Sequence, residues 1–333
     1  MAYHESKSAT YEHISSPAIS PDESIAIHPI RQSAQSNPLT KKEISLLAKR
    51  FSGKLLLRQE IEMDELLFSH LVSIHAFRPV PSIITSWKGE TCQRCGNQSK
   101  ALFAAMPCRK CQKRCIYCRK CIEMGRVLAC QPLYEWTSPT IHWPSIKDPC
   151  SWRGSLTAAQ EYASNRLIQA LHERGEMLVW AVCGAGKTEM LFPVITEALK
   201  QGKRICIATP RADVVRELKP RLLQAFPKVS IQALYGGSED KTGTAQLIIA
   251  TTHQLLRFKA AFDVMIIDEI DAFPYNKDAS LPFASNRAKK TPSTTIYLTA
   301  TPRKEHQLLI QKSSFRMCLC LSAITVTRFL FHN

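Results

Sequence analysis

The sequence has no long hydrophobic run and no targeting segment at its start. None of its apolar stretches reaches the roughly 18 residues that a membrane-spanning helix requires. Residues Met1 to Ser36 are polar and lack the basic and then apolar order of a secretory signal peptide. The sequence therefore predicts a cytoplasmic protein without a transmembrane segment.

Acidic residues are also scarce. The chain has 28 Asp and Glu residues against 44 Lys and Arg residues, a formal net charge of +16. A surface with this excess attracts polyanions, because binding neutralises phosphates and releases their counterions. The charge favours nucleic acid as a partner, with an anionic lipid surface or general basicity as alternatives.

A disulfide framework is not expected, because thiols stay reduced in the cytoplasm and cysteines there act as metal ligands or apolar fillers. Eight of the 13 cysteines lie within residues 91–130. A C-x2-C turn directs two thiolates at one tetrahedral ion, so two such turns can complete a structural zinc site. We expect at least one site built on Cys92, Cys95 and a later pair, and the eight cysteines leave one or two ions open. The ligand pairs are Cys92 and Cys95, Cys108 and Cys111, and Cys118 and Cys121, with Cys115 and Cys130 beside them.

The basic residues of the cysteine region predict a second property. Seven of them are interleaved with the ligands, and such a surface is suited to phosphate. The seven residues are Arg94, Arg109, Lys110, Lys113, Arg114, Arg119 and Lys120.

Composition divides the chain into five parts. Residues 1–40 are rich in Ser, Pro and His and predict a disordered tail. Residues 41–90 form a small N-terminal segment, and residues 91–135 form the zinc-binding module. Residues 150–312 alternate apolar runs with helical patterns, which indicates an α/β domain with a parallel sheet. Residues 313–333 are an atypical tail.

The predicted sheet places its ligands beyond the carboxyl ends of its strands. The strands are predicted at Met177–Val182, Arg204–Thr209, Leu247–Thr251, Val264–Asp268 and Ile296–Ala300, and helices at Glu189–Lys200 and Asp213–Ala225.

The first strand runs into a glycine-containing loop and then a helix, the setting of a phosphate-binding loop (P-loop). Such a loop turns successive N–H groups toward an anion, and the helix N-terminus adds its positive end. The first glycine of the general motif is missing, because Ala181 stands there, and the run fits the variant A-x-x-G-x-G-K-T. Lys187 is expected to reach the β- and γ-phosphates of ATP, and Thr188 to ligate Mg²⁺. The residues assigned to ATP and Mg²⁺ are Gln160, Gly184, Ala185, Gly186, Lys187, Thr188 and Asp268.

An acidic motif follows the fourth predicted strand. Asp268 is expected to hold Mg²⁺ through water and Glu269 to polarise the attacking water as general base. With Lys187, these two residues are the predicted catalytic set. Asp271, Thr299 and Thr301 are predicted to couple the nucleotide to a nucleic-acid site. Gln160 has two interpretations, adenine recognition and a helix capping box with Thr157.

Three strand ends carry small and polar residues suited to a sugar-phosphate backbone. The alternative is that the basic residues of this region form a solvated helix face. The assigned residues are Thr209, Arg211, Gly236, Gly237, Thr251, Thr252 and Gln254.

The series A-x-x-G-x-G-K-T, D-E-x-D and T-A-T-P resembles the first RecA-like domain of superfamily 2 helicases. Joined to the upstream block "CQRCGN…YCRKCIEMGRV", it resembles the late competence family ComFA of Gram-positive bacteria over roughly residues 50–312. The resemblance implies a RecA-like P-loop domain and an ATPase stimulated by single-stranded DNA. It further implies a role in DNA uptake during transformation, at the inner face of the membrane beside the uptake channel and other competence proteins.

The sequence departs from that family after Pro302. Superfamily 2 helicases close their site with a second RecA-like domain that carries a Gly-Arg pair and an arginine finger. Neither follows here, and the pattern indicates truncation or a frameshift after about Gln311. We expect nucleotide and DNA binding with poor turnover, and an aggregation-prone apolar tail.

Two other functions fit part of the pattern. A primosomal replication-restart helicase also joins this motor to zinc-binding cysteines, but there the cysteines follow the acidic motif. A non-motor protein that binds nucleic acid under the control of a nucleotide fits the missing second domain.

Overall fold

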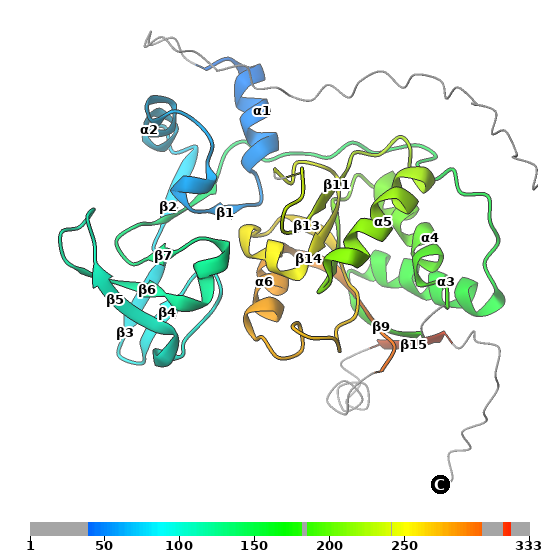
Figure 1. The fold of residues 1–333 in the computed structure, drawn as a ribbon. Helices are drawn as coiled ribbons and strands as arrows, with labels where there is room; N and C mark the ends of the chain where they lie inside the picture. Colours follow the sequence, from blue (N-terminus) through cyan, green and yellow to red (C-terminus); the bar gives the residue numbers. More distant parts are fainter. Residues whose placement is uncertain (1–38, 182–184, 241, 302–315, 321–333) are drawn as a thin grey trace, which may run out of the picture. The chain divides into compact units, whose positions relative to one another are not determined.

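The structure is a computed structural model that describes residues 39–181, 185–240, 242–301 and 316–320. Its centre is a seven-stranded sheet in the order β11-β12-β10-β13-β14-β9-β15 (Figure 1). All neighbouring strands are parallel, which confirms the predicted α/β fold. The strands are β9 Glu176–Ala181, β10 Ile205–Thr209, β11 Ile231–Leu234, β12 Leu247–Thr251, β13 Phe262–Ile267, β14 Lys289–Thr299 and β15 Arg316–Cys320.

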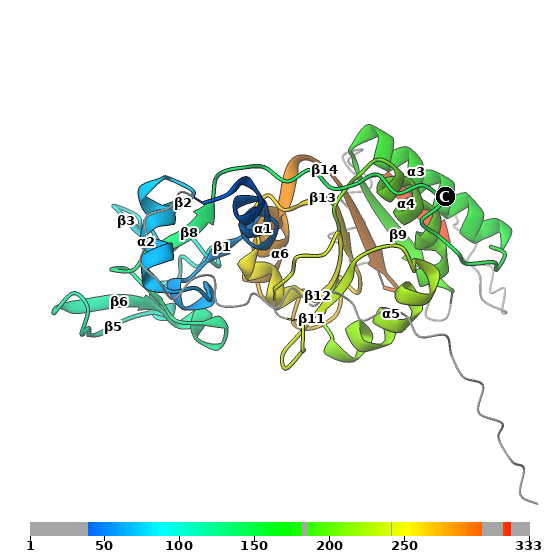
Figure 2. The same ribbon diagram turned by 90° about the horizontal axis from the view of Figure 1, so that it is seen from above.

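The two faces of the sheet are covered by different elements. Successive side chains of a strand point to opposite faces, so Val179 and Ile207 pack against one set of helices while Leu178 and Cys206 pack against another. The first face is covered by α3 Ala158–Glu173, α4 Lys187–Lys200 and α5 Ala212–Ala225 (Figure 2). The second is covered by η4 Thr252–Arg257, α6 Ser280–Ala288 and residues from the N-terminal region.

Burial on both faces explains why the strands read as continuous apolar runs. All five residues of β10 and of β12 are buried. The five predicted strands and the two predicted helices are all present. The short strands β11 and β15 were not predicted.

The N-terminal region forms a small sheet of its own, in the order β1-β8-β2. Its core packs Phe51 against Phe77 and Trp136, with ring centroids 5.1 and 6.2 Å from Phe51. Leu47 and Ala48 are adjacent on α1 and both are buried. The elements are α1 Lys41–Phe51, β1 Leu55–Leu56, η1 Arg58–Glu60, α2 Glu65–Ser73, β2 Phe77–Val80 and β8 Leu133–Trp136.

The cysteine region lies between β2 and β8 and consists of short hairpins and 3-10 turns. Its strands pair as β3 with β4 and as β5-β6-β7. Strand β8, which the sequence placed in the zinc module, pairs with β1 and β2, so the two parts share one sheet. The elements are β3 Ile83–Ser86, β4 Gly89–Cys92, η2 Lys100–Leu102, β5 Phe103–Pro107, β6 Arg114–Cys118, η3 Arg119–Met124 and β7 Val127–Leu128.

In the part of the chain that the structure describes, no helix has the length and apolar character to cross a bilayer. The predicted tail at residues 1–40 lies almost entirely outside the described residues, as does most of the predicted segment 313–333.

Candidate nucleotide site and cysteine centres

The loop between β9 and α4 is shaped by Gly186, the residue that precedes the helix. Gly186 has a φ of 68°, a conformation that favours glycine. A Cβ added there would lie 2.3 Å from Nε2 of Gln160, so a side chain at this position would displace the Gln160 amide. Lys187 and Thr188 then begin α4 with their N–H groups at its N-terminus. Gly184, also assigned to the nucleotide, lies outside the described residues.

Gln160 bridges the start of α3 and this loop. Its backbone and side chain form a capping box with Thr157, the structural interpretation left open by the sequence. Its Nε2 also donates to the carbonyl of Ala185 at 2.8 Å. The capping arrangement thus aims the Gln160 amide at the loop, and its contact with adenine stays a prediction.

Asp268 and Glu269 follow β13 at the same edge of the sheet. Burial raises the pKa of Asp268, and the charge of Lys187 opposes that rise. Burial also raises the pKa of Glu269, helped by the charge of Asp268. Glu269 has a left-handed φ of 53°, and its buried Oε2 has no hydrogen-bond partner among the described residues. Lys187 lowers the pKa of both carboxylates and Arg211 that of Glu269, but burial outweighs these charges, so a bound cation would improve the charge balance.

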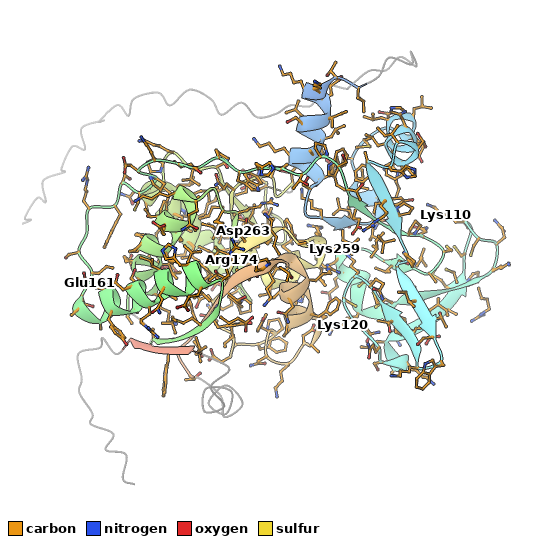
Figure 3. All side chains as sticks on the ribbon, turned by 180° about the vertical axis from the view of Figure 1, so that it is seen from behind. Lys110, Lys120, Glu161, Arg174, Lys259 and Asp263 are labelled. Atoms are coloured by element: carbon orange, nitrogen blue, oxygen red, sulfur yellow. The ribbon has the colours of Figure 1, made fainter. Side chains whose placement is uncertain are left out.

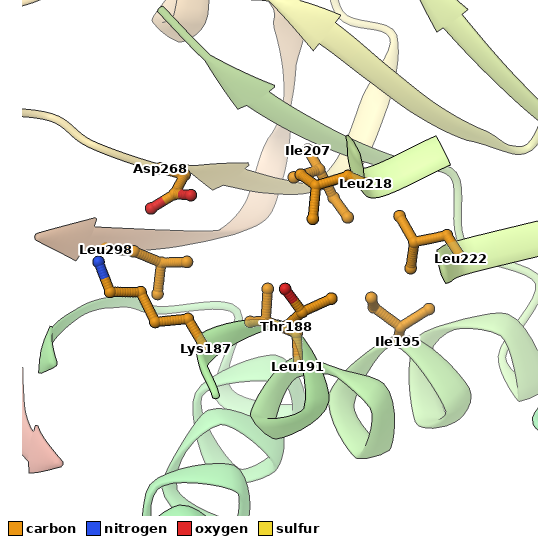
Figure 4. Close-up of a pocket in the computed structure, with 9 residues that line it drawn as sticks. All are labelled: Lys187, Thr188, Leu191, Ile195, Ile207, Leu218, Leu222, Asp268 and Leu298. Atoms are coloured by element: carbon orange, nitrogen blue, oxygen red, sulfur yellow. The ribbon is translucent and has the colours of Figure 1, made fainter. Parts of the chain in front are cut away.

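Lys187, Thr188 and Asp268 line one pocket (Figure 4). The rest of its lining is apolar and comes from α4, α5, β10 and β14. In the close-up the Lys187 amine and the Asp268 carboxylate lie at the same end of the group of lining residues, and the Thr188 side chain lies beside them at the start of α4. The lining residues are Lys187, Thr188, Leu191, Ile195, Ile207, Leu218, Leu222, Asp268 and Leu298.

Asp271 joins the acidic motif to the end of β14. The Thr299 hydroxyl donates to Oδ1 of Asp271 at 2.6 Å, and the Thr301 hydroxyl donates to Oδ2. Burial alone would raise the pKa of Asp271, but these hydrogen bonds outweigh it and the pKa lies below its ordinary value. The three residues predicted to couple the nucleotide to nucleic acid are thus in direct contact.

The candidate nucleic-acid residues lie at or just beyond the ends of β10, β11 and β12, three adjacent strands. Arg211, Gly236 and Gly237 are exposed there. Thr209 and Thr252 are fully buried, and Gln254 is 7% exposed, with its Oε1 accepting from Arg257. As folded here, Thr209, Thr252 and Gln254 cannot offer their side chains to a bound strand, and Thr251 is 8% exposed.

The basic residues of α5 are mostly paired. Lys219 binds Asp240 at 2.9 Å, and Arg221 binds Glu189 and Glu217 at 2.5 and 3.1 Å. This arrangement supports the alternative of a solvated helix face whose charges pair with one another.

The eight cysteines of residues 91–130 gather into two groups of four. The inner cluster is Cys92, Cys95, Cys118 and Cys121, and the outer cluster is Cys108, Cys111, Cys115 and Cys130. Within each, all sulfur atoms lie within 4.8 Å of one another.

The sulfur spacings fit a tetrahedral zinc ion. Zn–S bonds of about 2.3 Å place two ligand sulfurs roughly 3.8 Å apart. The measured separations are 3.8 Å for Cys92 and Cys121, 3.6 Å for Cys95 and Cys118, and 3.7 Å for Cys108 and Cys130. In the outer cluster, backbone hydrogen bonds from Cys111 and Lys110 lower the pKa of Cys108 to about 7, toward the thiolate that a metal requires.

The sequence did not assign Cys115 and Cys130 as ligands. The first and third C-x2-C pairs together form the inner cluster. The middle pair forms the outer cluster with Cys115 and Cys130, so the ligands of the two clusters alternate along the sequence. The number of cysteines could have indicated that Cys115 and Cys130 are ligands, because eight thiolates are enough for two complete four-ligand sites.

The expected phosphate contact at Arg94 is wrong. Its side chain is fully buried and binds Glu60 at 2.6 Å, and NH1 donates to the carbonyl of Gly125. Lys120 is paired with Asp278. Exposed basic residues remain around the outer cluster at Arg109, Lys110, Lys113 and Arg114.

Residues 37–135 match the family model described as the competence protein ComFA N-terminal domain. The chain is 48% identical to competence protein ComFA of Bacillus subtilis over 261 residues, 78% of this chain and 55% of that protein. The chain belongs to the ComFA family. It is also 44% identical to ComFA of Streptococcus pneumoniae over 57% of this chain and 43% of that protein. It thus spans about half the length of the curated relatives that it matches.

Residues 153–304 match the family model of the type III restriction enzyme res subunit. Among solved structures, a hypothetical ATP-dependent RNA helicase from Sulfolobus tokodaii is 18% identical, with a TM-score of 0.42 over 50% of this chain and 53% of that chain. A DEAD box protein from Methanococcus jannaschii is 16% identical, with a TM-score of 0.38 over 52% of this chain and 56% of that chain.

Proposed function

We propose that this ComFA-family chain is an ATP-binding subunit of a DNA-uptake motor that hydrolyses ATP in response to single-stranded DNA. The observation that carries the proposal is the convergence of Lys187, Thr188 and Asp268 on one pocket at the carboxyl edge of the sheet. Ligands of parallel α/β sheets bind at this edge. The loop before Lys187 has the tight backbone that an approaching phosphate requires.

The residues present fit a magnesium nucleotide. Burial disfavours the charged forms of Asp268 and Glu269 and raises their pKa values, so both carboxylates would gain from additional positive charge. Bound Mg²⁺ supplies that charge and polarises the terminal phosphate. Thr188 and Asp268 would hold the ion, and Lys187 would neutralise the developing charge on the phosphate oxygens.

Glu269 is the proposed general base. Its buried Oε2 has no hydrogen-bond partner within the described ranges, so it is available to accept a hydrogen bond from the attacking water. Asp271 accepts hydrogen bonds from Thr299 and Thr301. A change at the acidic motif on nucleotide binding or hydrolysis would therefore move the end of β14 through these two bonds.

Single-stranded DNA is proposed to lie across the ends of β10, β11 and β12. Arg211, Gly236 and Gly237 would contact phosphates there, and the basic rim of the outer cysteine cluster would add a second contact. In this proposal both clusters hold Zn²⁺, and the motor works at the inner face of the cell membrane beside an uptake channel and other competence proteins.

Steady-state ATP turnover by the full chain, with and without single-stranded DNA, tests the motor. We expect DNA to raise the rate, Lys187→Ala to abolish the stimulated rate, and Lys200→Ala to leave it unchanged. Lys200 is a matched control because it is an exposed lysine at the other end of the same helix. DNA and ATP binding without stimulation would favour the nucleotide-controlled binding protein instead.

A further inference from the structure

A second cavity lies at the opposite edge of the central sheet, where the strands begin. Arg204 precedes β10, Ala260 and Ala261 precede β13, and Lys290 lies near the start of β14. The N-terminal region closes it with Ser52, Lys54 and Trp136, among others. A strand of five residues spans about 16 Å, so this cavity is separate from the nucleotide site at the carboxyl edge. Its volume is about 300 Å³, at the lower end of the range of small-molecule pockets.

The lining of this cavity is strongly cationic. Five cationic side chains line it, and the carboxylates of Glu135 and of the neighbouring Asp263 offset two of these charges, which leaves an excess of three positive charges. Arg78 and Lys259 share Glu135, and Lys290 binds Asp263 at 3.0 Å (Lys259 and Asp263 are labelled in Figure 3). The five are Lys54, Arg78, Arg204, Lys259 and Lys290.

Two of these cations are buried without a carboxylate partner among the ion pairs of the described residues. Lys54 is 6% exposed, and its ammonium donates to the carbonyls of Arg50 and Thr242. Arg204 is 2% exposed, and its guanidinium donates to the carbonyls of Gly243 and Ala245 at 2.7 and 3.2 Å. Burying a charge is costly unless an opposite charge compensates it. Burial and the nearby arginines lower the pKa of Lys54 well below its ordinary value, which a bound anion would reverse.

A third observation points to the same place. Ser52 is one of the residues that line the cavity, and its hydroxyl oxygen, which is closed to solvent, has no hydrogen-bond partner among the described residues. Buried hydroxyls are normally satisfied by protein, water or ligand. Ser52 can donate one hydrogen bond through its O–H, so its hydroxyl suits an anion that also needs cationic neighbours.

We propose that this cavity is a binding site for a phosphate monoester or free phosphate, held by Lys54, Arg204 and the Ser52 hydroxyl. Phosphate carries up to two charges and three or more acceptor oxygens, which matches two buried cations and an unpaired donor better than a single carboxylate does. The volume admits a small phosphorylated molecule or the phosphorylated end of a longer one. The site is independent of ATP hydrolysis at the other edge.

Ala260 provides a matched pair of variants. It lines the cavity, is exposed and has a left-handed φ of 47°, a conformation in which Asp and Asn are both enriched. Ala260→Asp and Ala260→Asn fill the same space and differ by one negative charge. We expect Ala260→Asp to weaken phosphate binding about tenfold or more and Ala260→Asn to change it far less.

Isothermal titration with inorganic phosphate tests the proposal, using the full chain with Lys187→Ala so that the nucleotide loop does not contribute. Lys259→Gln serves as a second variant, because Glu135 keeps Arg78 as partner, and a several-fold loss is expected. Absence of saturable phosphate binding, or equal affinity of the Ala260→Asp and Ala260→Asn variants, would overturn the proposal.

Two further ligands identify the source of the phosphate. Glycerol phosphate represents a lipid headgroup, and a 5′-phosphorylated dinucleotide represents a nucleic-acid end, with the unphosphorylated dinucleotide as control. Tighter binding of either ester than of inorganic phosphate supports the site and names its ligand class. Equal binding of all three phosphates supports a site for the phosphate group alone, and binding of the unphosphorylated control with the same affinity contradicts it.

Discussion

The two cysteine clusters offer the same ligands in opposite surroundings. All four inner cysteines are buried, and they belong to one apolar core with Phe262 and Met265 of the central sheet. The outer cluster contains the half-buried Cys111 and the exposed Cys130. Equal metal chemistry therefore need not mean an equal role, because the inner cluster is part of the main core and the outer cluster is a surface module.

The backbone around the inner cluster is also fastened to the central domain. Arg287 of α6 donates to the carbonyls of Gln93 and Arg94, the two residues between the first ligand pair. The same guanidinium donates to the carbonyls of Leu256 and Phe258. Glu60 adds a second link, because it binds Arg94 at 2.6 Å and Arg257 at 2.9 Å.

Removing one ligand from each cluster should give the largest contrast. Cys118→Ser breaks the inner site inside the core, and we expect it to lower the free energy of unfolding by about 4 kcal/mol or more, because metal binding contributes directly to folding. Cys111→Ser should lose one metal ion but cost the central domain less than about 1 kcal/mol. Thermal melts combined with zinc content by mass spectrometry measure both. Equal destabilisation by the two variants would remove the distinction between the clusters.

The link through Arg287 should have the next largest effect. Arg287→Gln leaves several buried carbonyls without their donor, and we expect a loss of about 2–4 kcal/mol in unfolding free energy. Arg126→Gln is the control, because Arg126 is an exposed residue of the cysteine region. If the two variants have the same melting temperature, the hydrogen bonds of Arg287 do not tie the inner cluster to the central domain.

The outer cluster should affect binding more than stability. Replacing both Lys113 and Arg114 by Gln removes two exposed charges, and we expect weaker single-stranded DNA binding. The slope of its salt dependence should fall by roughly 1.4, about 0.7 for each phosphate that is no longer neutralised. Lys228→Gln, at an exposed position on the central domain, should leave the slope nearly unchanged. Fluorescence anisotropy across a salt series provides the slopes, and identical slopes would show that the outer cluster is not part of the DNA path.

The nucleotide site differs from both cysteine clusters, because its proposed cation, Mg²⁺, would bind only together with a nucleotide. Without nucleotide, its buried carboxylates have no metal ion beside them. The pKa of Glu269 is raised in the folded chain, so the folded state holds its proton more firmly than the unfolded state does. Its ionisation therefore reduces stability as pH rises above the ordinary Glu pKa. We expect Glu269→Gln to be more stable than wild type at pH 7 and to lose that advantage near pH 4, in urea unfolding without nucleotide. A constant difference between the two pH values would contradict the raised pKa.

Sequence patterns were sufficient for the parts of the fold with strong local signals. The strands β9, β10, β12, β13 and β14 are apolar because both faces are buried, and their polar ends marked the edge where Lys187 and Asp268 meet. Strand β11 was missed because Ile231–Leu234 is short and contains a glutamine.

Contacts distant in sequence could not be predicted in the same way. The C-x2-C spacing identified ligand pairs but not their interleaving, which depends on how β5, β6 and β7 fold back. The burial of Arg94 beside Glu60, and of Thr209 and Thr252 in the core, depends on neighbours from other elements. The cationic cavity could not be predicted from the sequence either. Ser52 and Lys54 are far from Arg204 in the sequence, and the three come together only in the folded chain.

The most direct test of the nucleotide site is the affinity of a slowly hydrolysed ATP analogue, measured by titration with and without Mg²⁺. We predict saturable binding to the full chain that Mg²⁺ strengthens, a decrease of about a hundredfold for Lys187→Ala on the scale of a charged hydrogen bond, and no decrease for Lys200→Ala. Asp268→Asn should remove the benefit of Mg²⁺. Equal affinities for the Lys187 and Lys200 variants, or binding indifferent to Mg²⁺, would contradict a magnesium-nucleotide site at this edge of the sheet.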